Sequence, residues 1–115
     1  MLRLETFGGL VLTAGGVECP QPRRRLAVLA RLAAPGALGV SRDELHATFW
    51  PERDVVAARH SLDQLLYETR RALGASPTAG TGTLRLDPGV ITSDVADWTA
   101  ALQRGDLAAA AALCR

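Results

Sequence analysis

The chain contains 115 residues, 48% of them hydrophobic, which predicts one domain with a core and leaves room for part of a second. Its formal net charge is +1, lower than that of many dedicated nucleic-acid-binding proteins, and all 13 basic residues are arginine. No apolar run approaches the roughly 18 residues that cross a membrane, and the N-terminus lacks the apolar segment of a signal peptide, so we expect a cytoplasmic protein.

Residues 1–19 carry the pattern of short β-strands. Leu2 and Leu4 alternate with polar residues, and small residues at Gly8-Gly9 and Ala14–Gly16 provide two turns. A second apolar run lies between these turns, and Val17–Cys19 follows the last one. Three strands separated by tight turns predict an antiparallel meander.

A first helix is expected over Arg23–Ala34. Pro22 suits the first turn of a helix, where its missing N–H costs nothing, and Pro35-Gly36 ends the pattern. One face carries the apolar residues Leu26, Leu29, Ala30 and Ala33. Arg23, Arg24 and Arg25 form the one basic cluster of the sequence. Cations oppose the helix dipole at this end, so the cluster is either a solvated first turn or a set of phosphate contacts.

A capping box marks the start of a second, short helix. Ser41 and Glu44 stand three residues apart, so that each side chain can accept from the other's backbone N–H. Val40 and Leu45 occupy the positions of a hydrophobic staple, and Leu45 and Phe49 point inward. The helix is expected to stop at Trp50-Pro51, and we interpret Trp50 as a packing residue.

The longest helical pattern covers Val55–Leu73. Its apolar residues keep to one face of a helix with 3.6 residues per turn: Ala58, Leu62, Leu65, Leu66 and Leu73. The opposite face carries a row of hydrogen-bonding side chains: His60, Gln64, Tyr67 and Arg71. A short helix followed closely by a longer one that is polar outside predicts a helix-turn-helix.

The segment after this helix has the composition of a loop followed by two strands. Gly74 is expected to end the helix, and Ala75–Gly82 is rich in small and polar residues. Thr83–Leu86 alternates as a strand, Asp87–Gly89 predicts a turn, and Val90–Ser93 predicts another strand. A β-segment directly after a helix-turn-helix lies where a wing would be.

The last segment changes to helix. Asp94 is expected to cap a helix that buries Val95, Trp98 and Leu102, and Gly105-Asp106 interrupts it. Leu107–Arg115 predicts a second, alanine-rich helix. A hairpin of small residues resembles one unit of a helical repeat, which cannot bury its own face alone. We therefore expect the natural protein to continue beyond this point.

Several motifs follow one another in a recognisable order. They are Pro22-Arg23-Arg24-Arg25, Val40-Ser41-Arg42-Asp43-Glu44-Leu45, Phe49-Trp50-Pro51, Ala58-Arg59-His60-Ser61-Leu62, Leu66-Tyr67, Arg70-Arg71-Ala72-Leu73-Gly74, Leu84-Arg85-Leu86-Asp87-Pro88 and Ser93-Asp94-Val95. Together they resemble the N-terminal part of SARP-type bacterial transcriptional activators. The resemblance covers the whole chain, and its most specific part is Trp50-Pro51 combined with the helix that carries Tyr67.

The resemblance implies a fold and a function. It implies an α+β protein with an OmpR-like winged helix-turn-helix over residues 1–93, including the N-terminal meander. Residues 94–115 would be the first TPR-like hairpin of a truncated bacterial transcriptional activator domain (BTAD). Proteins of this family bind double-stranded DNA on direct repeats as side-by-side protomers and help recruit RNA polymerase. By this likeness Val55–Leu73 is the recognition helix in the major groove, and a reduced wing lies near residues 78–86.

The expected contacts fall into two groups. The base-facing side chains would be His60, Gln64, Tyr67 and Arg71, since arginine can fork onto guanine and an amide can pair with adenine. The phosphate contacts would be Arg59, Arg70, Arg85, Arg23, Arg24 and Arg25. Two acids stand among them: Asp63 and Glu68 would repel phosphate, yet they could accept from cytosine or orient Arg59 and Arg71 along the helix.

Some features favour an alternative, a protein-interaction or adaptor module with weak or no DNA binding. Residues 52–73 contain four arginines and four acids, and Ser76–Ala79 replaces the apolar strand usual before the wing turn. An enzyme is a distant third, because the sequence has no phosphate-binding glycine loop before a capped helix and no catalytic constellation. Cys19 and Cys114 have neither metal-site spacing nor a disulfide framework, and no cofactor is expected.

Overall fold

The N-terminal segment forms the predicted meander. The computed structural model describes residues 1–114. Strands β1 (Leu2–Glu5), β2 (Val11–Ala14) and β3 (Val17–Glu18) pair in antiparallel order. Leu2 and Leu4 of β1 are buried, as their alternation predicted.

A fourth strand joins this sheet from the end of residues 1–93, which are called the winged region below. Strand β7 (Ile91–Ser93) runs parallel to β1, with Leu2 opposite Ile91, and the sheet order is β3-β2-β1-β7. A strand was expected at β7, but its pairing with β1 was not. The N-terminal sheet thereby carries the chain directly into α4 (Asp94–Gln103).

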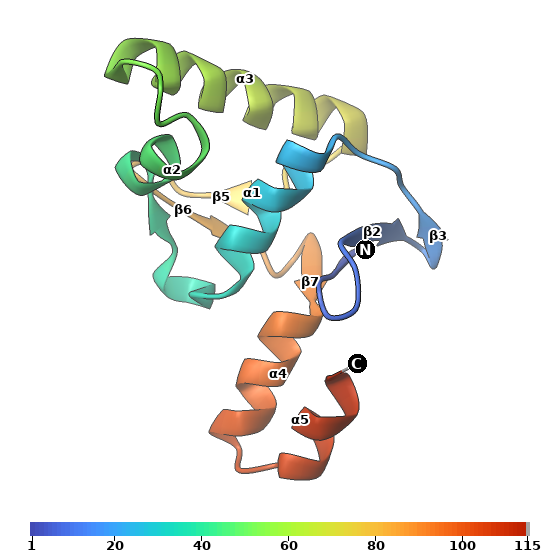
Figure 1. Cartoon of the computed structure of the whole chain (residues 1–115). Coiled ribbons are helices and arrows are strands. Elements are labelled where there is room, and N and C mark those ends of the chain that lie inside the picture. The colour runs from blue at the N-terminus through green and yellow to red at the C-terminus, as the bar shows by residue number, and fades with distance from the viewer. Residues whose placement is uncertain (115) are drawn as a thin grey trace.

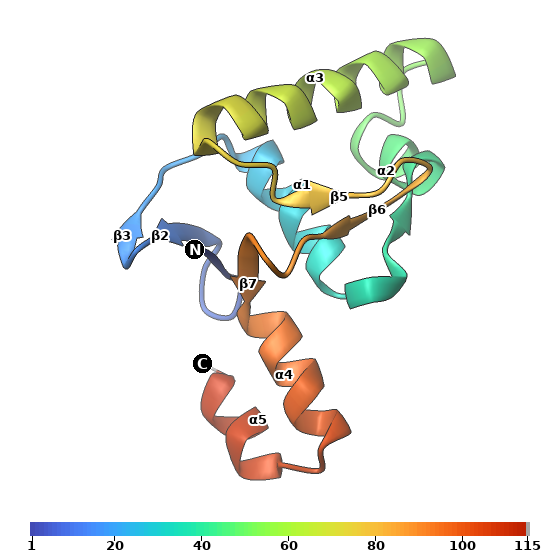
Figure 2. The same cartoon turned by 180° about the vertical axis from the view of Figure 1, so that it is seen from behind.

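Three helices and a short wing make up the rest of the winged region (Figures 1 and 2). Helix α1 (Arg23–Ala33) and a turn of 3-10 helix (Gly36–Leu38) precede α2 (Arg42–Phe49) and α3 (Val55–Leu73). The bounds of α3 agree with the prediction. None of the helices among residues 1–114 is both long and apolar enough to cross a membrane.

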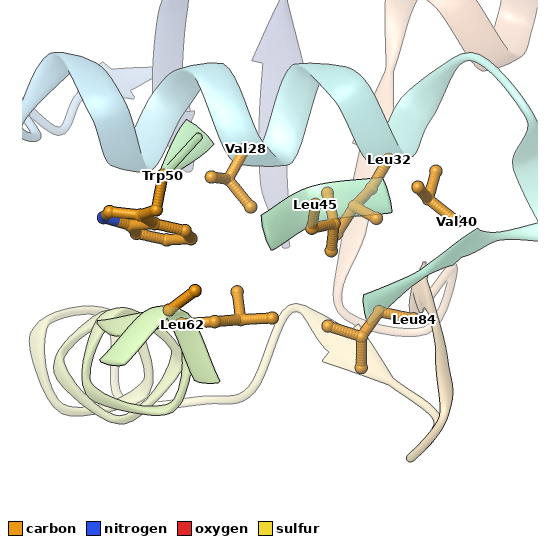
Figure 3. Close-up of a cluster of buried hydrophobic side chains, with 8 residues drawn as sticks. Val28, Leu32, Val40, Leu45, Trp50, Leu62 and Leu84 are labelled. Carbon is orange, nitrogen blue, oxygen red and sulfur yellow. The ribbon is translucent and has the colours of Figure 1, made fainter. Parts of the chain in front are cut away.

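Helix α1 separates two apolar clusters. Leu26 and Leu29 face the N-terminal sheet and pack with Leu4 and Ile91. The other face supplies Val28 and Leu32, which sequence periodicity did not single out. Figure 3 shows these two side chains in the second cluster, whose other members are Val40, Leu45, Trp50, Ala58, Leu62 and Leu84. Trp50 is buried, as predicted, and lies between the helices.

The wing is present but short. Strand β5 (Thr78–Ala79) pairs with β6 (Thr83–Leu86), which in turn pairs with β4 (Val40–Ser41). The sequence pattern predicted a loop at Thr78–Ala79, and this was wrong. Pairing with β6 overrides the weak local signal of these two residues. The order β4-β6-β5 ties the wing to Ser41, the N-cap residue of α2.

The helix ends show which capping predictions hold. Ser41 Oγ accepts from the N–H of Glu44 at 3.2 Å, and Gly74 ends α3 with a left-handed φ of 75°. The prediction that the Glu44 carboxylate accepts in return from the N–H of Ser41 is wrong. The Glu44 carboxylate lies 3.3 Å from Arg31 of α1, and the backbone of Ser41 is engaged in β4. Asp54 caps α3 through the N–H of Ala57.

The C-terminal helices form a hairpin that projects from the winged region (Figure 1). They are α4 and α5 (Leu107–Leu113); the expected helix end at Arg115 lies outside the described residues. Two expectations for α4 were wrong. Ser93 is its N-cap, accepting from the N–H of Ala96, while Asp94 is the first helical residue. Leu102 is 40% exposed, and the buried position belongs to Ala101.

Candidate nucleic-acid interface

The outer face of α3 carries the predicted row of polar side chains. His60, Gln64, Tyr67 and Arg71 are all exposed. Ala58, Leu62 and Thr69 are buried on the inner face, and the Thr69 hydroxyl donates back to the carbonyl of Leu65 at 2.7 Å. Helix α3 lies at the edge of the molecule in both views (Figures 1 and 2), so its outer face is open to a partner.

The row is held in place by contacts along the helix. Gln64 Nε2 donates to Glu68 Oε1 at 3.0 Å, and Arg71 donates to the Tyr67 hydroxyl at 3.4 Å. The Arg70 guanidinium lies 5.9 Å from the centre of the Tyr67 ring. These contacts are one turn apart and exposed, so each is weak and can be exchanged for a contact with a ligand.

The two acids of the outer face are paired with other helices. Asp63 binds Arg42 of α2 at 2.9 Å, and Glu68 lies 3.5 Å from Arg25 of α1. The expectation that these acids orient Arg59 and Arg71 within α3 was therefore wrong. Arginines of the two neighbouring helices lie within ion-pair distance of these carboxylates. The formal neutrality of α3 thus understates the positive charge of the surface around it.

The predicted basic cluster is divided between two environments. Arg23 and Arg24 are exposed, and Arg24 lies over the Trp50 ring at 5.7 Å. The Arg25 side chain is largely buried, with 11% of it exposed, and it is hydrogen-bonded to Gln21 and paired with Glu68. The cluster is therefore neither a fully solvated turn nor a set of three free phosphate contacts.

A basic groove runs between α1 and α3. It has a volume of about 330 Å³ and is lined by Arg24, Arg53, His60 and Gln64, with Trp50 in its wall. Arg53 lies in the turn before α3 and donates to Ser61 at 2.6 Å. Sequence reasoning missed Arg53, whose one signal was its place in the turn of a helix-turn-helix.

A second groove separates α3 from the wing. Its volume is about 290 Å³, and its lining includes Arg42, Tyr67, Arg70 and Thr78. Arg42 was also missed, although it directly follows the capping Ser41. The structure thus brings Tyr67 and Arg70 to the wing side of α3, and His60 and Gln64 to the α1 side.

Arg59 and Arg85 stand apart from these contacts. Arg59 is exposed on α3 and Arg85 on β6, and neither forms an ion pair within residues 1–114. Over the same residues, no group of three or more acidic, cysteine or histidine side chains is placed to hold a metal ion. Cys19 and Cys114 form no disulfide.

Comparison with known proteins shows one likeness of fold. No protein-family model and no curated protein matches the sequence. Among solved structures, EmbR of Mycobacterium tuberculosis, determined in complex with a low-affinity phosphopeptide, superposes with a TM-score of 0.71 and 24% identity. The match covers 99% of this chain and 36% of EmbR, so the chain spans about a third of that protein. The likeness supports the predicted α+β class and shows a fold shared with this part of EmbR.

Proposed function

We propose that the chain is a DNA-binding part of a bacterial transcriptional regulator. Helix α3 would enter the major groove, and the wing near residues 78–86 would approach the adjacent minor groove. Two independent lines support this: the motifs of the sequence resemble SARP-type activators, and the order of elements is shared with EmbR over 99% of the chain. The winged helix would span residues 1–93, and residues 94–115 would begin a TPR-like BTAD.

The arrangement around α3 carries the proposal. One exposed row of hydrogen-bonding side chains lies between two grooves that are both lined by arginine. A helix in the major groove reads base edges with such side chains, while flanking cations hold the phosphates. Arg71 would fork onto guanine and Gln64 would pair with adenine, with His60 and Tyr67 beside them.

The proposed phosphate contacts extend beyond α3. They are Arg59, Arg70, Arg85, Arg23, Arg24 and Arg25. Arg59 and Arg85 are free to contact phosphate directly, whereas Arg25 must first exchange its pair with Glu68. Since the cations come from α1, α3 and β6, the footprint is broader than the neutral charge count of α3 indicates.

The proposed partners follow from the resemblance. They are double-stranded DNA with direct repeats, a second protomer bound side by side, and RNA polymerase. The setting is the bacterial cytoplasm, and the proposed role is regulatory, with no reaction catalysed and no cofactor required.

A salt titration of DNA binding tests the proposal. About four to six arginine–phosphate contacts predict a log–log slope of roughly −0.9 per contact on a duplex. Arg71→Ala should lower affinity by about tenfold, since one forked base contact is worth about 1–3 kcal/mol. The matched control is Arg104→Ala, an exposed arginine next to the turn between α4 and α5. Absence of binding at low salt by the folded protein would refute the proposal.

A protein-interaction module is the second candidate. It is favoured by Val55 and Val56, which are 62% and 76% exposed at the start of α3. Such side chains suit a protein partner better than a phosphate backbone. Under this reading Val56→Asp would abolish partner binding, and the salt titration would show no duplex binding.

A further inference from the structure

Arg42 contacts two other elements of the proposed interface at once. It is the first residue of α2, and its backbone N–H donates to the carbonyl of Gly82 in the wing turn at 3.1 Å. Its Nε donates to the carbonyl of Thr81 in the same turn. Its Nη1 donates to Asp63 Oδ1 on α3 at 2.9 Å. The side chain therefore bridges the wing turn and the recognition helix.

An arginine is well suited to the two side-chain contacts. The guanidinium is a planar fork with several donors in fixed directions, so one side chain can serve a carbonyl and a carboxylate together. Its side chain is 28% exposed, compared with 57% for Asp63, so the pair lies partly sheltered between the two elements. Partial shelter reduces the screening that weakens surface ion pairs.

The wing turn has few other attachments. Strand β5 has only two residues, and a hairpin this short is not stable by itself. Leu84 anchors β6 in the core, but the turn at residues 80–82 lies beyond it. Within residues 1–114, the hydrogen bonds from outside the wing to this turn both come from Arg42. One of these bonds comes from the Arg42 backbone and continues the pairing of β4 with β6, so it attaches the turn to the start of α2 whatever the side chain does. The hydrogen-bonded link from the turn to α3, in contrast, runs through the Arg42 side chain.

We propose that Asp63 is a positioning residue that, through Arg42, fixes the wing turn against the recognition helix. The proposal rests on the proposed function, since it assigns the pair a role in DNA binding. Asp63 holds the guanidinium at 2.9 Å in the orientation that reaches Thr81, so the wing and α3 approach DNA as one preformed surface. Preorganisation of this kind reduces the ordering cost of binding.

The groove between α3 and the wing shows where the Arg42–Asp63 pair would lie in the proposed complex with DNA. If α3 enters the major groove and the wing the next minor groove, one DNA strand must cross the space between them. That space is the groove of about 290 Å³ lined by Arg42, Asp63 and Arg70. The width of this groove is set by the same contacts that hold the turn.

The proposal opposes the simple electrostatic expectation. Asp63 is an acid on the DNA-facing helix, so its removal alone should raise affinity for phosphate. If Asp63 positions the wing through Arg42, its removal should instead lower affinity. The sign of the effect therefore separates the two accounts.

The first experiment measures the free protein. Hydrogen–deuterium exchange of residues 78–86 is compared in the wild type, Asp63→Ala, Arg42→Ala and the double variant. We expect exchange about fivefold faster in each single variant, the scale of losing one partly exposed ion pair, with little further change in the double variant. Exchange in β1 should stay unchanged, which excludes global destabilisation. Unchanged exchange in the wing of both single variants would overturn the proposal.

The second experiment measures binding to a random duplex at low salt. Asp63→Ala should bind about fivefold more weakly. Its matched control is Asp43→Ala, which removes the same charge beside Arg42 from a carboxylate that forms no ion pair within residues 1–114, and which should bind equally or more tightly. Tighter binding by both variants would overturn the role of Asp63. Faster wing exchange in the two single variants, together with no DNA binding by the wild type, would support the positioning role of Asp63 and refute the proposed function.

Discussion

Acidic side chains are held differently at the two ends of the winged region. At the junction between the N-terminal sheet and α4, Asp94 is 1% exposed. Its carboxylate accepts from the N–H groups of Thr6 and Phe7, each at 2.8 Å, and from the Thr6 hydroxyl at 3.0 Å. On α3, Asp63 and Glu68 are about half exposed, and each is paired with one arginine.

This difference in burial predicts that the acid at the junction matters for stability and the acids on α3 matter for binding. A buried carboxylate that satisfies several donors cannot be removed without leaving those donors unpaired in the interior. An exposed ion pair contributes little to stability, but it sets the position of a side chain at the surface. We therefore expect the junction to control folding and the α3 surface to control recognition.

The largest expected effect is at the junction. Asp94→Ala should lower the free energy of unfolding by about 3 kcal/mol, because it leaves the N–H groups of Thr6 and Phe7 without acceptors. Asp97→Ala is the matched control, since this acid of the same helix forms an exposed pair with Arg3 and should cost about 1 kcal/mol or less. Urea denaturation measures both. Equal losses would show that the junction is no different from the surface.

The next effect tests the wing, whose strand β5 has only two residues. Gly80 has a φ of +101°, and a Cβ there would lie 2.1 Å from the carbonyl oxygen of Thr83. Gly80→Ala should therefore cost about 2 kcal/mol and weaken DNA binding, because the hairpin must distort. At Gly82 a Cβ would meet nothing within 4 Å, so Gly82→Ala serves as the control. Denaturation and duplex binding measure the two effects, and similar results for both glycines would contradict the prediction.

A smaller effect is the pH dependence of the junction. Burial opposes the charged form of Asp94, but hydrogen bonds from Phe7 and Thr6 outweigh it and hold the pKa of Asp94 below its ordinary value of 3.8. A lowered folded-state pKa means that the stability from this group is present above the unfolded pKa. It is lost as the pH falls through the folded pKa.

The measurement is urea denaturation between about pH 6 and about pH 2. The wild type should lose stability below its ordinary carboxyl pKa more steeply than Asp94→Asn, which has no proton to gain at this position. Parallel profiles for the two proteins would show that Asp94 is not the group responsible.

The smallest effect is at a single exposed arginine of α3. Arg59→Ala should leave stability within about 0.5 kcal/mol of the wild type, since the side chain has no ion pair within residues 1–114. It should make the log–log salt slope of DNA binding about 0.9 less steep if it contacts one phosphate. An unchanged slope would remove Arg59 from the proposed phosphate contacts.

The local order of the chain was largely predictable. The bounds of α3, the end of α2 at Trp50 and the turn at Gly74 agree with the sequence pattern. Caps act over about three residues and helical periodicity over about four, so these signals lie within a short stretch of sequence. The exposed row of α3 was predictable for the same reason, although its role in binding stays a prediction.

Only the tertiary structure decided how distant segments meet. The parallel pairing of β7 with β1, the acceptor role of Asp94 toward Thr6, and the pairing of Asp63 with Arg42 all join residues far apart. Arg42 and Asp63 are 21 positions apart, and Thr6 and Asp94 are 88 apart. A local pattern shows that Asp63 is exposed on a helix. It does not show which arginine can reach it, because that depends on how α2, α3 and the wing pack around the buried cluster.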